Sequence, residues 1–341
     1  MGELLKVDKI KTEFQTDKGP ITSVDEVSFD LNEGETICLV GESGCGKSVT
    51  SLSIMRLLDK NGAVTNGSIV FNGKDLVNIS EAEMRKVRGN EISMIFQEPM
   101  TSLNPVLTIG DQLAEGIRLH MGYSKKKARD YAVEMLKKVG IPRAEAIISE
   151  YPHRLSGGMR QRVMIAMALS CKPKLLIADE PTTALDVTIQ AQILKLMKAL
   201  REDSKTAILL ITHDLGVVAE MADKVVVMYA GQVVEETDVF TLFDNPKHPY
   251  TLGLMKSIPH ITNPDDMRLD SIPGSVPSAR NMPKGCRFCA RCPYAMERCK
   301  TEQPELRSIE DKQSHSLRCF LYEKEENAYA EKVQAEKEVS S

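Results

Sequence analysis

The fold of this chain is decided by the stretch Gly41-Glu42-Ser43-Gly44-Cys45-Gly46-Lys47-Ser48. It fits the pattern G-x-x-x-x-G-K-[ST], in which a glycine-rich loop brings its backbone close to phosphate groups. The apolar run at residues 36–40 predicts a buried strand before the loop, and apolar residues at helical spacing over residues 48–58 predict a helix after it. Because such a loop and helix N-terminus present backbone N–H groups to an anion, the stretch predicts a nucleotide site.

The residue types within this loop predict its contacts. Lys47 should reach the β- and γ-phosphates, and the hydroxyl of Ser48 should ligate Mg²⁺. Phe14 precedes a predicted turn and is a candidate to stack on an adenine ring, although a core aromatic residue at a strand end is an equal alternative. The other predicted contacts with the nucleotide are Gly41, Ser43, Gly44, Cys45, Gly46 and Val49.

Composition narrows the class of protein. The 44 basic and 48 acidic residues nearly balance, so the composition lacks the excess of basic residues that is typical of nucleic-acid-binding proteins. No apolar run approaches the length of a membrane span, and the first residues lack the features of a signal peptide. We therefore expect a soluble cytosolic protein, in which the eight cysteines are metal ligands or buried thiols rather than disulfides.

The remaining pattern predicts an α/β fold, with a P-loop ATPase core, an antiparallel β subdomain and an inserted helical subdomain. A strand pair around Gly19-Pro20, and a further strand before the turn dipeptide Asn72-Gly73, predict the antiparallel part. Helical periodicity predicts an inserted helical subdomain at about residues 98–160. Buried core strands are expected at residues 91–96, 175–180 and 207–211, a helix at residues 189–200, and a hairpin at residues 224–235.

The composition changes near Phe240, where prolines become frequent and periodicity is lost. We therefore predict an ATP-binding domain at residues 1–240 and a small Cys-rich C-terminal domain at residues 241–341, with a regulatory or metal-binding role. From Glu323 onward the charged sequence predicts a frayed helix or a flexible tail.

Two carboxylates follow the buried run at residues 175–178. Asp179 is expected to hold Mg²⁺ through water, beside Ser48 and Gln97. Glu180 is expected to activate the attacking water as a general base, and tuning the field around Mg²⁺ is its alternative role. His213 follows another buried strand, where we favour a γ-phosphate contact over a purely structural histidine. Glu180, His213, Gln97 and Lys47 are thus the predicted catalytic residues.

Taken together, these pieces resemble the nucleotide-binding subunits of ATP-binding cassette transporters, over roughly residues 4–240. Gly41–Ser48 resembles the Walker A loop, and Asp179 with the preceding strand resembles Walker B. Gln97 resembles the Q-loop glutamine, and His213 the switch histidine. The family signature is matched by Leu155-Ser156-Gly157-Gly158 with Gln161, and the D-loop by Ala184-Leu185-Asp186.

The resemblance implies an assembly. In this family Ser156, Gly158 and Gln161 close over ATP held by a second cassette, with Asp186 at the same interface. One chain carries one cassette, so we expect a second ATP-binding cassette subunit, as a homologous heterodimer partner or as a homodimer. The resemblance also implies two transmembrane permease subunits, an extracellular substrate-binding protein as an indirect partner, and a position on the inner face of the cell membrane.

A narrower resemblance concerns the cargo. The stretches Gln97-Glu98-Pro99-Met100-Thr101-Ser102-Leu103-Asn104-Pro105 and Asn245-Pro246-Lys247-His248-Pro249-Tyr250-Thr251 resemble the dipeptide and oligopeptide importer ATPases. So does Pro273-Gly274-Ser275-Val276-Pro277 followed by Gly285-Cys286. A nickel importer of the same family is the nearest alternative, because cargo is chosen by subunits outside this chain. A soluble cassette ATPase acting on DNA or ribosomes is disfavoured, and a pure iron–sulfur redox protein does not explain the ATP site.

Five cysteines are crowded into residues 286–319, in the order Cys286-x₂-Cys289-x₂-Cys292-Pro293 and then Cys299 and Cys319. Thiolates at this spacing suit a [4Fe–4S] cluster or, alternatively, tetrahedral Zn²⁺, and unbound reduced thiols are a third possibility. The family resemblance implies Cys286, Cys292, Cys299 and Cys319 as the ligands, with Cys289 as an extra or alternative thiol. Such a centre would tie down a Pro-rich segment that has few apolar residues.

Overall fold

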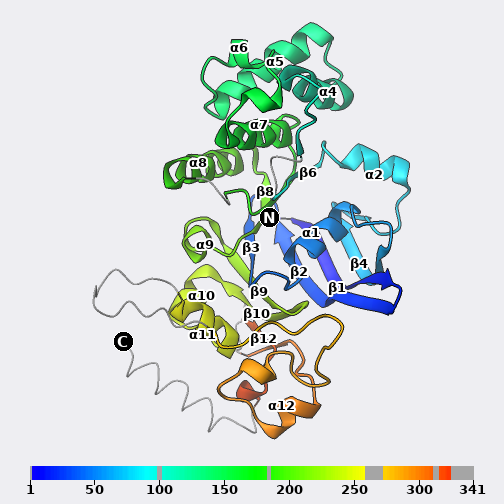
Figure 1. The fold of residues 1–341 in the computed structure, drawn as a ribbon, viewed down its shortest axis with the longest axis vertical. Coiled ribbons are helices and arrows are strands. Elements are labelled where there is room, and N and C mark those ends of the chain that lie inside the picture. Colours follow the sequence, from blue (N-terminus) through cyan, green and yellow to red (C-terminus); the bar gives the residue numbers. More distant parts are fainter. Residues whose placement is uncertain (1, 98–101, 183–185, 258–271, 310–314, 324–341) are drawn as a thin grey trace.

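Two β-sheets occupy the centre of the computed structural model, which describes residues 2–97, 102–182, 186–257, 272–309 and 315–323 (Figure 1). The larger sheet has the strand order β11-β12-β10-β9-β3-β8-β7-β6. Its strands are β3 (Thr36–Val40), β6 (Ile92–Ile95), β7 (Leu175–Asp179), β8 (Ala207–Ile211), β9 (Lys224–Tyr229), β10 (Gln232–Asp238), β11 (Arg307–Ser308) and β12 (Ser316–Leu317).

The middle of this sheet is parallel and buried. β3 pairs in parallel with β8 and β9, and β7 pairs in parallel with β8 and β6. Every residue of β3, β7 and β8 is buried, as expected for a parallel sheet covered on both faces. The carboxyl ends of parallel strands share one edge, so the loops after β3, β7 and β8 meet there.

The smaller sheet is the predicted antiparallel subdomain, with the order β2-β1-β4-β5. It is formed by β1 (Glu3–Thr16), β2 (Gly19–Asn32), β4 (Gly62–Phe71) and β5 (Lys74–Asp75). The turn between β1 and β2 lies at Asp17 and Lys18, two residues before the expected Gly19-Pro20. The predicted turn at Asn72-Gly73 is confirmed, and both residues have the positive φ angles that a tight hairpin turn requires.

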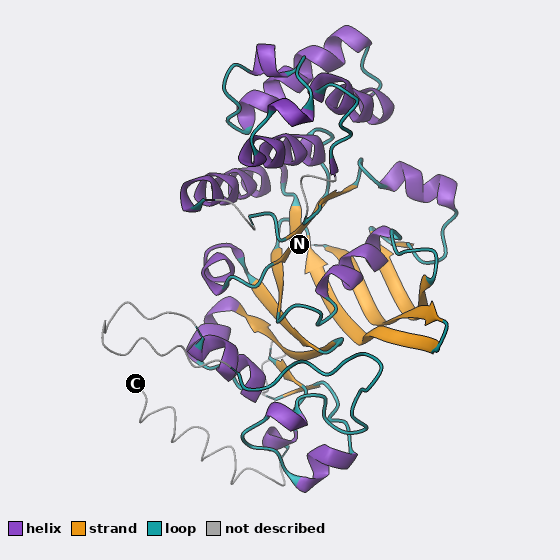
Figure 2. Cartoon of the chain, viewed as in Figure 1, coloured by secondary structure: helices purple, strands orange, loops and turns teal. Residues whose placement is uncertain are grey.

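Helices gather at the end of the molecule opposite the C-terminal segment (Figure 2). They are α4 (Ile109–Met121), α5 (Lys125–Lys138), the short α6 (Ala144–Ile147), the 3-10 turn η1 (Pro152–Arg154) and α7 (Gly157–Leu169). The hydroxyls of Thr108 and Ser124 cap α4 and α5 by accepting from backbone N–H groups one turn in. α4, α5, α6 and η1 lie within the region predicted to be a helical subdomain, residues 98–160, whereas α7 begins there and extends beyond it. Residues 98–101 of that region lie outside the described residues.

Further helices flank the sheets. They are α1 (Lys47–Met55), α2 (Glu81–Val87), α8 (Val187–Ser204) and α9 (Leu215–Met221). α8 begins two residues before the expected start, because the carboxylate of Asp186 caps it by accepting from the N–H of Ile189. In the described residues no helix is long and apolar enough to cross a bilayer.

The C-terminal segment is continuous with the larger sheet. It contains α10 (Val239–Asp244), α11 (Pro249–Lys256), η2 (Cys289–Arg291), α12 (Glu297–Thr301) and η3 (Phe320–Tyr322). β12 pairs antiparallel with β10, and Tyr250 and Phe288 belong to the same buried cluster as Val40 of β3. The segment therefore packs against the ATP-binding core, and it buries apolar residues of its own such as Phe320.

A buried carboxylate holds this junction together. Glu235 of β10 has no exposed surface and accepts hydrogen bonds from the backbone N–H groups of Lys247 and His248, at 2.8 and 3.0 Å. His315, next to β12, lies 2.9 Å from it through Nε2. A buried charge with several donors of this kind fixes the geometry around it, because losing any one of them leaves an unsatisfied group.

Candidate functional site

The glycine-rich loop follows β3 directly and leads into α1, as predicted. Gly41 has a φ of 148°, and a Cβ atom there would lie 2.2 Å from the carbonyl oxygen of Met228. Gly46, the residue before α1, has a φ of 103°, and a Cβ atom there would lie 2.9 Å from the carbonyl oxygen of Ser23. Glycine is required at both positions, because neighbouring backbone approaches too closely for any side chain.

Lys47 lies at the predicted phosphate-binding position, and Ser48 lies at the predicted Mg²⁺ position. The ammonium group of Lys47 is buried and donates to the carbonyl oxygens of Gly41 and Glu42, at 2.6 and 3.0 Å. It therefore lies inside the curve of the loop, where phosphate oxygens bind in loops of this kind. The hydroxyl of Ser48 donates to a carboxylate oxygen of Asp179, at 3.1 Å.

Asp179 is the last residue of β7 and only 4% of its surface is exposed. Burial raises the pKa of its carboxyl group, the hydrogen bond from Ser48 opposes that shift, and the charge of Glu180 adds to it. A divalent cation held between the hydroxyl and this carboxylate would compensate the buried charge. Oxygen donors of these two kinds fit Mg²⁺, as the sequence predicts.

Glu180 lies between two of the other three predicted catalytic residues, Gln97 and His213. Its carboxylate accepts from the side-chain amide of Gln97, at 3.1 Å, and lies 3.3 Å from Nδ1 of His213. Its backbone has a φ of 47°, a conformation that only a few per cent of non-glycine residues adopt. Strain of this kind is characteristic of active sites, because it persists only where the surroundings hold it in place. Gln97 thus contacts Glu180, one residue beyond the predicted magnesium ligand.

The start of α7 carries the predicted half-site for a second nucleotide. Ser156 is exposed and caps the helix by accepting from the N–H of Met159, at 3.3 Å. Gly157 is exposed and a Cβ atom there would meet nothing, whereas Gly158 is partly buried. This end of α7 is an open N-terminus, and the N–H groups of such an end attract anions.

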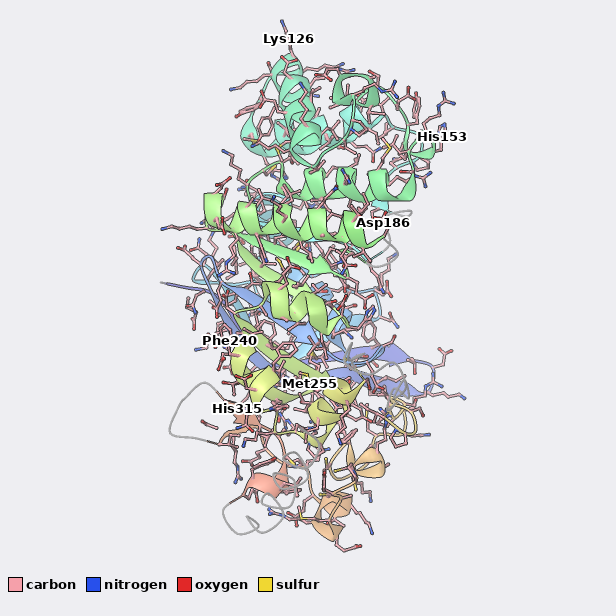
Figure 3. All side chains as sticks on the ribbon, turned by 90° about the vertical axis from the view of Figure 1, so that its left-hand side faces the viewer. Lys126, His153, Asp186, Phe240, Met255 and His315 are labelled. Atoms are coloured by element: carbon pink, nitrogen blue, oxygen red, sulfur yellow. The ribbon has the colours of Figure 1, made fainter. Side chains whose placement is uncertain are left out.

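Gln161 and Asp186 have positions that the sequence did not reveal. Gln161 is buried, and its side-chain amide donates to the carbonyl oxygen of Pro181, at 2.6 Å, which links α7 to the segment that follows β7 and contains Glu180. Asp186 is exposed at the start of α8, between the helical end that carries Lys126 and the opposite end that carries His315 (Figure 3). Ala184 and Leu185 lie outside the described residues.

The remaining predicted contacts are distributed around the loop. Ser43 and Gly44 are exposed on it, Cys45 is fully buried, and Val49 lies partly buried on α1. Burial raises the pKa of the Cys45 thiol, and the nearby charge of Lys47 opposes that shift. Phe14 lies on β1 with its ring against Gly62 of β4. Its role as an adenine platform stays a prediction.

Two residues that the sequence analysis did not assign to the site also hold the loop. The guanidinium of Arg291, from η2, donates to both carboxylate oxygens of Glu42, at 2.6 and 2.9 Å. The phenol oxygen of Tyr250, from α11, accepts from the backbone N–H of Glu42, at 2.8 Å. Leu254 of α11 and Ser257, the residue after that helix, line a cavity of about 270 Å³, whose other walls include Gly41 and His213.

The five C-terminal cysteines come together around one small cavity. Cys286, Cys289, Cys292, Cys299 and Cys319 line it, together with His248, Phe288 and Phe320. Burial raises the pKa of the Cys286 thiol to about 11 and that of Cys292 to about 12. No group of three or more His, Cys, Asp or Glu side chains within the described ranges has the geometry of a metal site. The predicted clustering is therefore present, whereas the predicted coordination is not formed by the side chains as they lie.

Two protein-family models match the sequence of this chain. The model of the ABC transporter family matches residues 24–183, which include the loop, Gln97, Asp179 and Glu180. The model of the oligopeptide/dipeptide transporter C-terminal region matches residues 234–299, which include Tyr250, Arg291 and four of the clustered cysteines.

Two curated relatives match along nearly their whole length. The chain is 60% identical over 326 residues to the oligopeptide transport ATP-binding protein AppD of Bacillus subtilis, covering 95% of this chain and 98% of that protein. It is 52% identical over 308 residues to the dipeptide transport ATP-binding protein DppD of Escherichia coli, covering 90% of this chain and 94% of that protein.

Solved structures confirm the fold of the ATP-binding part. The structure is similar to the dimeric post-hydrolysis state of the ATP-binding cassette MJ0796 bound to ADP and Pi, with a TM-score of 0.64 and 27% identity, covering 69% of this chain and 99% of that one. It is also similar to cbiO1 from Clostridium perfringens, described as part of an ABC transporter complex, with a TM-score of 0.60 and 26% identity, covering 72% of this chain and 92% of that one.

Proposed function

The chain belongs to the ATPases of the ABC transporter family, and since its C-terminal part matches the region of oligopeptide and dipeptide transporters, we propose that it is the ATP-hydrolysing subunit of an importer of dipeptides or oligopeptides. One observation carries the chemical half of the proposal. Glu180 is held between Gln97 and His213, directly beside the pair formed by Ser48 and Asp179. A general base, a magnesium site and a phosphate loop are the parts that ATP hydrolysis needs.

In the proposed mechanism, this chain's residues bind and orient the reactants. The loop amides and Lys47 would hold the β- and γ-phosphates, while Ser48 and Asp179 would hold Mg²⁺, which would neutralise charge on the phosphate oxygens. Glu180 takes a proton from the attacking water, and His213 steadies both the Glu180 carboxylate and the γ-phosphate. Gln97 follows β6, beside the helical subdomain, so we infer that it relays changes at Glu180 to that subdomain.

The proposed assembly has three further components. Ser156 and the exposed start of α7 lie at the surface, where they are available to close over a nucleotide held by a second cassette. We expect that cassette to be a homologous partner or a second copy of this chain. We also expect two transmembrane permeases, with an extracellular binding protein delivering the peptide. The chain would then lie on the inner face of the cell membrane.

Uptake measurements test this proposal. Cells lacking this chain should lose import of labelled di- or oligopeptides, and a plasmid-borne copy should restore it. The Lys47→Ala variant should not restore import, because its phosphate contact is lost. Membrane extracts should yield the chain together with permease subunits. Unchanged peptide uptake combined with a loss of nickel accumulation would overturn the peptide assignment and favour a nickel importer.

For the cysteine cavity we propose a metal centre held by Cys286, Cys292, Cys299 and Cys319, with Cys289 as an alternative ligand. The donor chemistry fits, because several thiols that line one cavity are the ligand set preferred by iron–sulfur clusters and by tetrahedral Zn²⁺. A [4Fe–4S] cluster is the favoured occupant and Zn²⁺ the alternative. Bound there, it would add a structural cross-link within the C-terminal domain proposed at residues 241–341.

Anaerobic purification tests the centre directly. A brown protein with about four irons per chain would support the cluster. Cys292→Ser should remove the colour and increase proteolysis of the C-terminal part, while ATP binding at the loop persists in weakened form. Colourless protein with stoichiometric zinc would establish the alternative. Metal-free protein with a protease-resistant C-terminal part would overturn both.

A further inference from the structure

Arg291 is a buried cation that reaches from the cysteine-rich segment to the phosphate-binding loop. It ends η2, the 3-10 turn that begins at Cys289, and only 4% of its side chain is exposed. Its guanidinium uses a planar fork to donate to both oxygens of the Glu42 carboxylate, at 2.6 and 2.9 Å. Arg and carboxylate groups in this two-bond geometry fix each other's orientation as well as their distance.

The remaining donors of Arg291 anchor it within the C-terminal segment. Nε donates to the carbonyl oxygen of Pro273, at 2.9 Å, and Nη2 to that of Ile272, at 3.2 Å. Nη1 lies 3.4 Å from the hydroxyl of Tyr229, at the end of β9. The side chain is therefore held from behind by the C-terminal segment and offers its fork to the loop. A rigid contact of this kind transmits position, because the cation has no freedom to follow a moving loop.

Glu42 is fixed at three points. Arg291 holds its carboxylate, Tyr250 accepts from its backbone N–H, and its carbonyl oxygen accepts from Lys47, at 3.0 Å. The N–H of Cys45 also donates to that carbonyl oxygen, at 3.3 Å, which closes the turn of the loop. The conformation of the phosphate cradle thus depends on where Glu42 lies.

The ion pair between Arg291 and Glu42 also changes the charge at the phosphate-binding loop. Glu42 places a negative charge within the loop that must receive the negatively charged phosphates of ATP. Pairing with a buried guanidinium neutralises that charge. It also directs the carboxylate toward the C-terminal segment, so that Lys47 contacts carbonyl oxygens of the loop and remains available to phosphate.

We propose that Arg291 is a positioning residue for ATP binding, which holds Glu42 and thereby couples the cysteine-lined cavity to the affinity of the phosphate-binding loop. Cys289 and Cys292 flank Arg291 in sequence and line that cavity, so any change that reshapes η2 moves the guanidinium. The cavity thus adjusts nucleotide affinity without contacting the nucleotide. This proposal rests on nucleotide binding at the loop and not on the identity of the cargo.

Equilibrium binding of MgATP to the full-length chain tests the proposal. Arg291→Met keeps the length of the side chain and removes its charge. We expect it to weaken MgATP binding by about tenfold, the scale of a lost charge-assisted hydrogen bond. Arg298→Met is the matched control, because Arg298 lies in the same segment but pairs with Glu302 and Glu323, away from the loop. The control should change the affinity by less than about twofold.

Testing Arg291→Met in a Glu42→Gln variant distinguishes a positioning role of Arg291 from a general loss of structure. With Glu42→Gln in place, the guanidinium has no carboxylate to neutralise, so adding Arg291→Met should weaken MgATP binding by less than about threefold. An equal loss in both backgrounds would overturn the proposal, since that is the result expected if Arg291 only stabilises its own segment. Arg291→Lys, which keeps the charge but not the fork, should fall between the wild type and Arg291→Met.

Two further readouts do not depend on affinity alone. In the complex with its partner subunits, Arg291→Met should raise the KM for ATP, while kcat at saturating ATP stays within about twofold. In the nucleotide-free chain, amide exchange should accelerate at residues 41–46 in Arg291→Met but not in Arg298→Met. Unchanged exchange of the loop, or a fall in kcat with an unchanged KM, would overturn the proposal.

Discussion

Ser48 donates its hydroxyl hydrogen to a carboxylate oxygen of Asp179 across 3.1 Å, although 131 positions separate the two residues in sequence. Ser48 lies at the end of the loop that follows β3, and Asp179 is the last residue of β7. In the sheet, β8 lies between these two strands. The parallel sheet therefore brings together the two residues of the proposed magnesium site, because its strand ends share one edge.

Replacing Asp179 by Asn tests this pairing. The variant retains a side chain of the same size but loses the charge that compensates Mg²⁺. We expect the apparent affinity for Mg²⁺ in ATP hydrolysis to fall by about 10- to 100-fold. Titrating Mg²⁺ at fixed ATP measures the effect. Unchanged dependence on Mg²⁺ would show that the ion is held elsewhere. Asp203→Asn, at an exposed position near the end of α8, is the control for the loss of a carboxylate.

The contact between Gln161 and Pro181 gives a second prediction. Because the amide donates to a buried carbonyl oxygen, Gln161→Leu leaves that oxygen unsatisfied and should destabilise the chain by about 1–3 kcal/mol. It should also slow hydrolysis, since Pro181 directly follows Glu180. Urea denaturation and steady-state turnover measure the two effects. The exposed Gln192 gives the control Gln192→Leu, and equal effects in the two variants would contradict a role for this contact.

Ser156 gives a third prediction, about pairing of cassettes. Ser156→Arg places a bulky side chain at the exposed start of α7 while leaving the loop after β3 untouched. ATP-driven association with a second cassette should be lost, whereas binding of ATP to the isolated chain should stay within about twofold. Size-exclusion chromatography in a Glu180→Gln background, where bound ATP persists, reports association. A variant that still pairs on adding ATP would contradict the two-cassette arrangement.

Local sequence patterns predicted the parts of the site whose geometry is local. The loop, the end of β7 and the signature residues at the start of α7 each lie within a few residues of the pattern that reveals them. The pattern also predicted antiparallel and helical subdomains, which the structure confirms. By contrast, α9 was not predicted, because its seven residues are too few for a clear helical period.

Long-range contacts account for most of what the sequence did not reveal. The fork between Arg291 and Glu42 joins residues 249 positions apart, and nothing near either residue indicates its partner. The Pro-rich segment was expected to need a metal for want of apolar residues. In the structure it also adds β12 to the larger sheet, and Arg318 donates to carbonyl oxygens of Val233 and Pro304. Buried arginines paired with backbone oxygens do not appear in any count of apolar residues.

The imidazole of His248 gives a fourth prediction, about pH. Burial lowers its pKa to about 4, against 6.5 for an unperturbed imidazole, while the nearby charge of Glu235 acts in the opposite direction. The unfolded chain therefore binds a proton between these values that the folded chain does not. The contribution to stability is complete above about pH 6.5, and it decreases by up to about 3 kcal/mol as the pH falls toward 4.

His248→Asn removes this titration and keeps a side chain able to accept from the N–H of Tyr250. Unfolding free energies from urea titrations at pH 5 and pH 7 should differ less in this variant than in the wild type. The control is His153→Asn, which makes the same substitution at an exposed histidine. Parallel pH profiles for wild type and His248→Asn would contradict the assignment.

The rate of ATP hydrolysis by the Glu180→Gln variant tests the central claim most directly, measured on the full-length chain purified with its membrane partners. The amide keeps the size of the side chain but cannot accept a proton from water, while Lys47, Ser48 and Asp179 remain to bind MgATP. We predict that MgATP binding is retained within about threefold and that steady turnover falls by on the order of 10²-fold or more. Turnover within about twofold of the unaltered complex would contradict the claim that this site, with Glu180 as its base, hydrolyses the ATP that drives import.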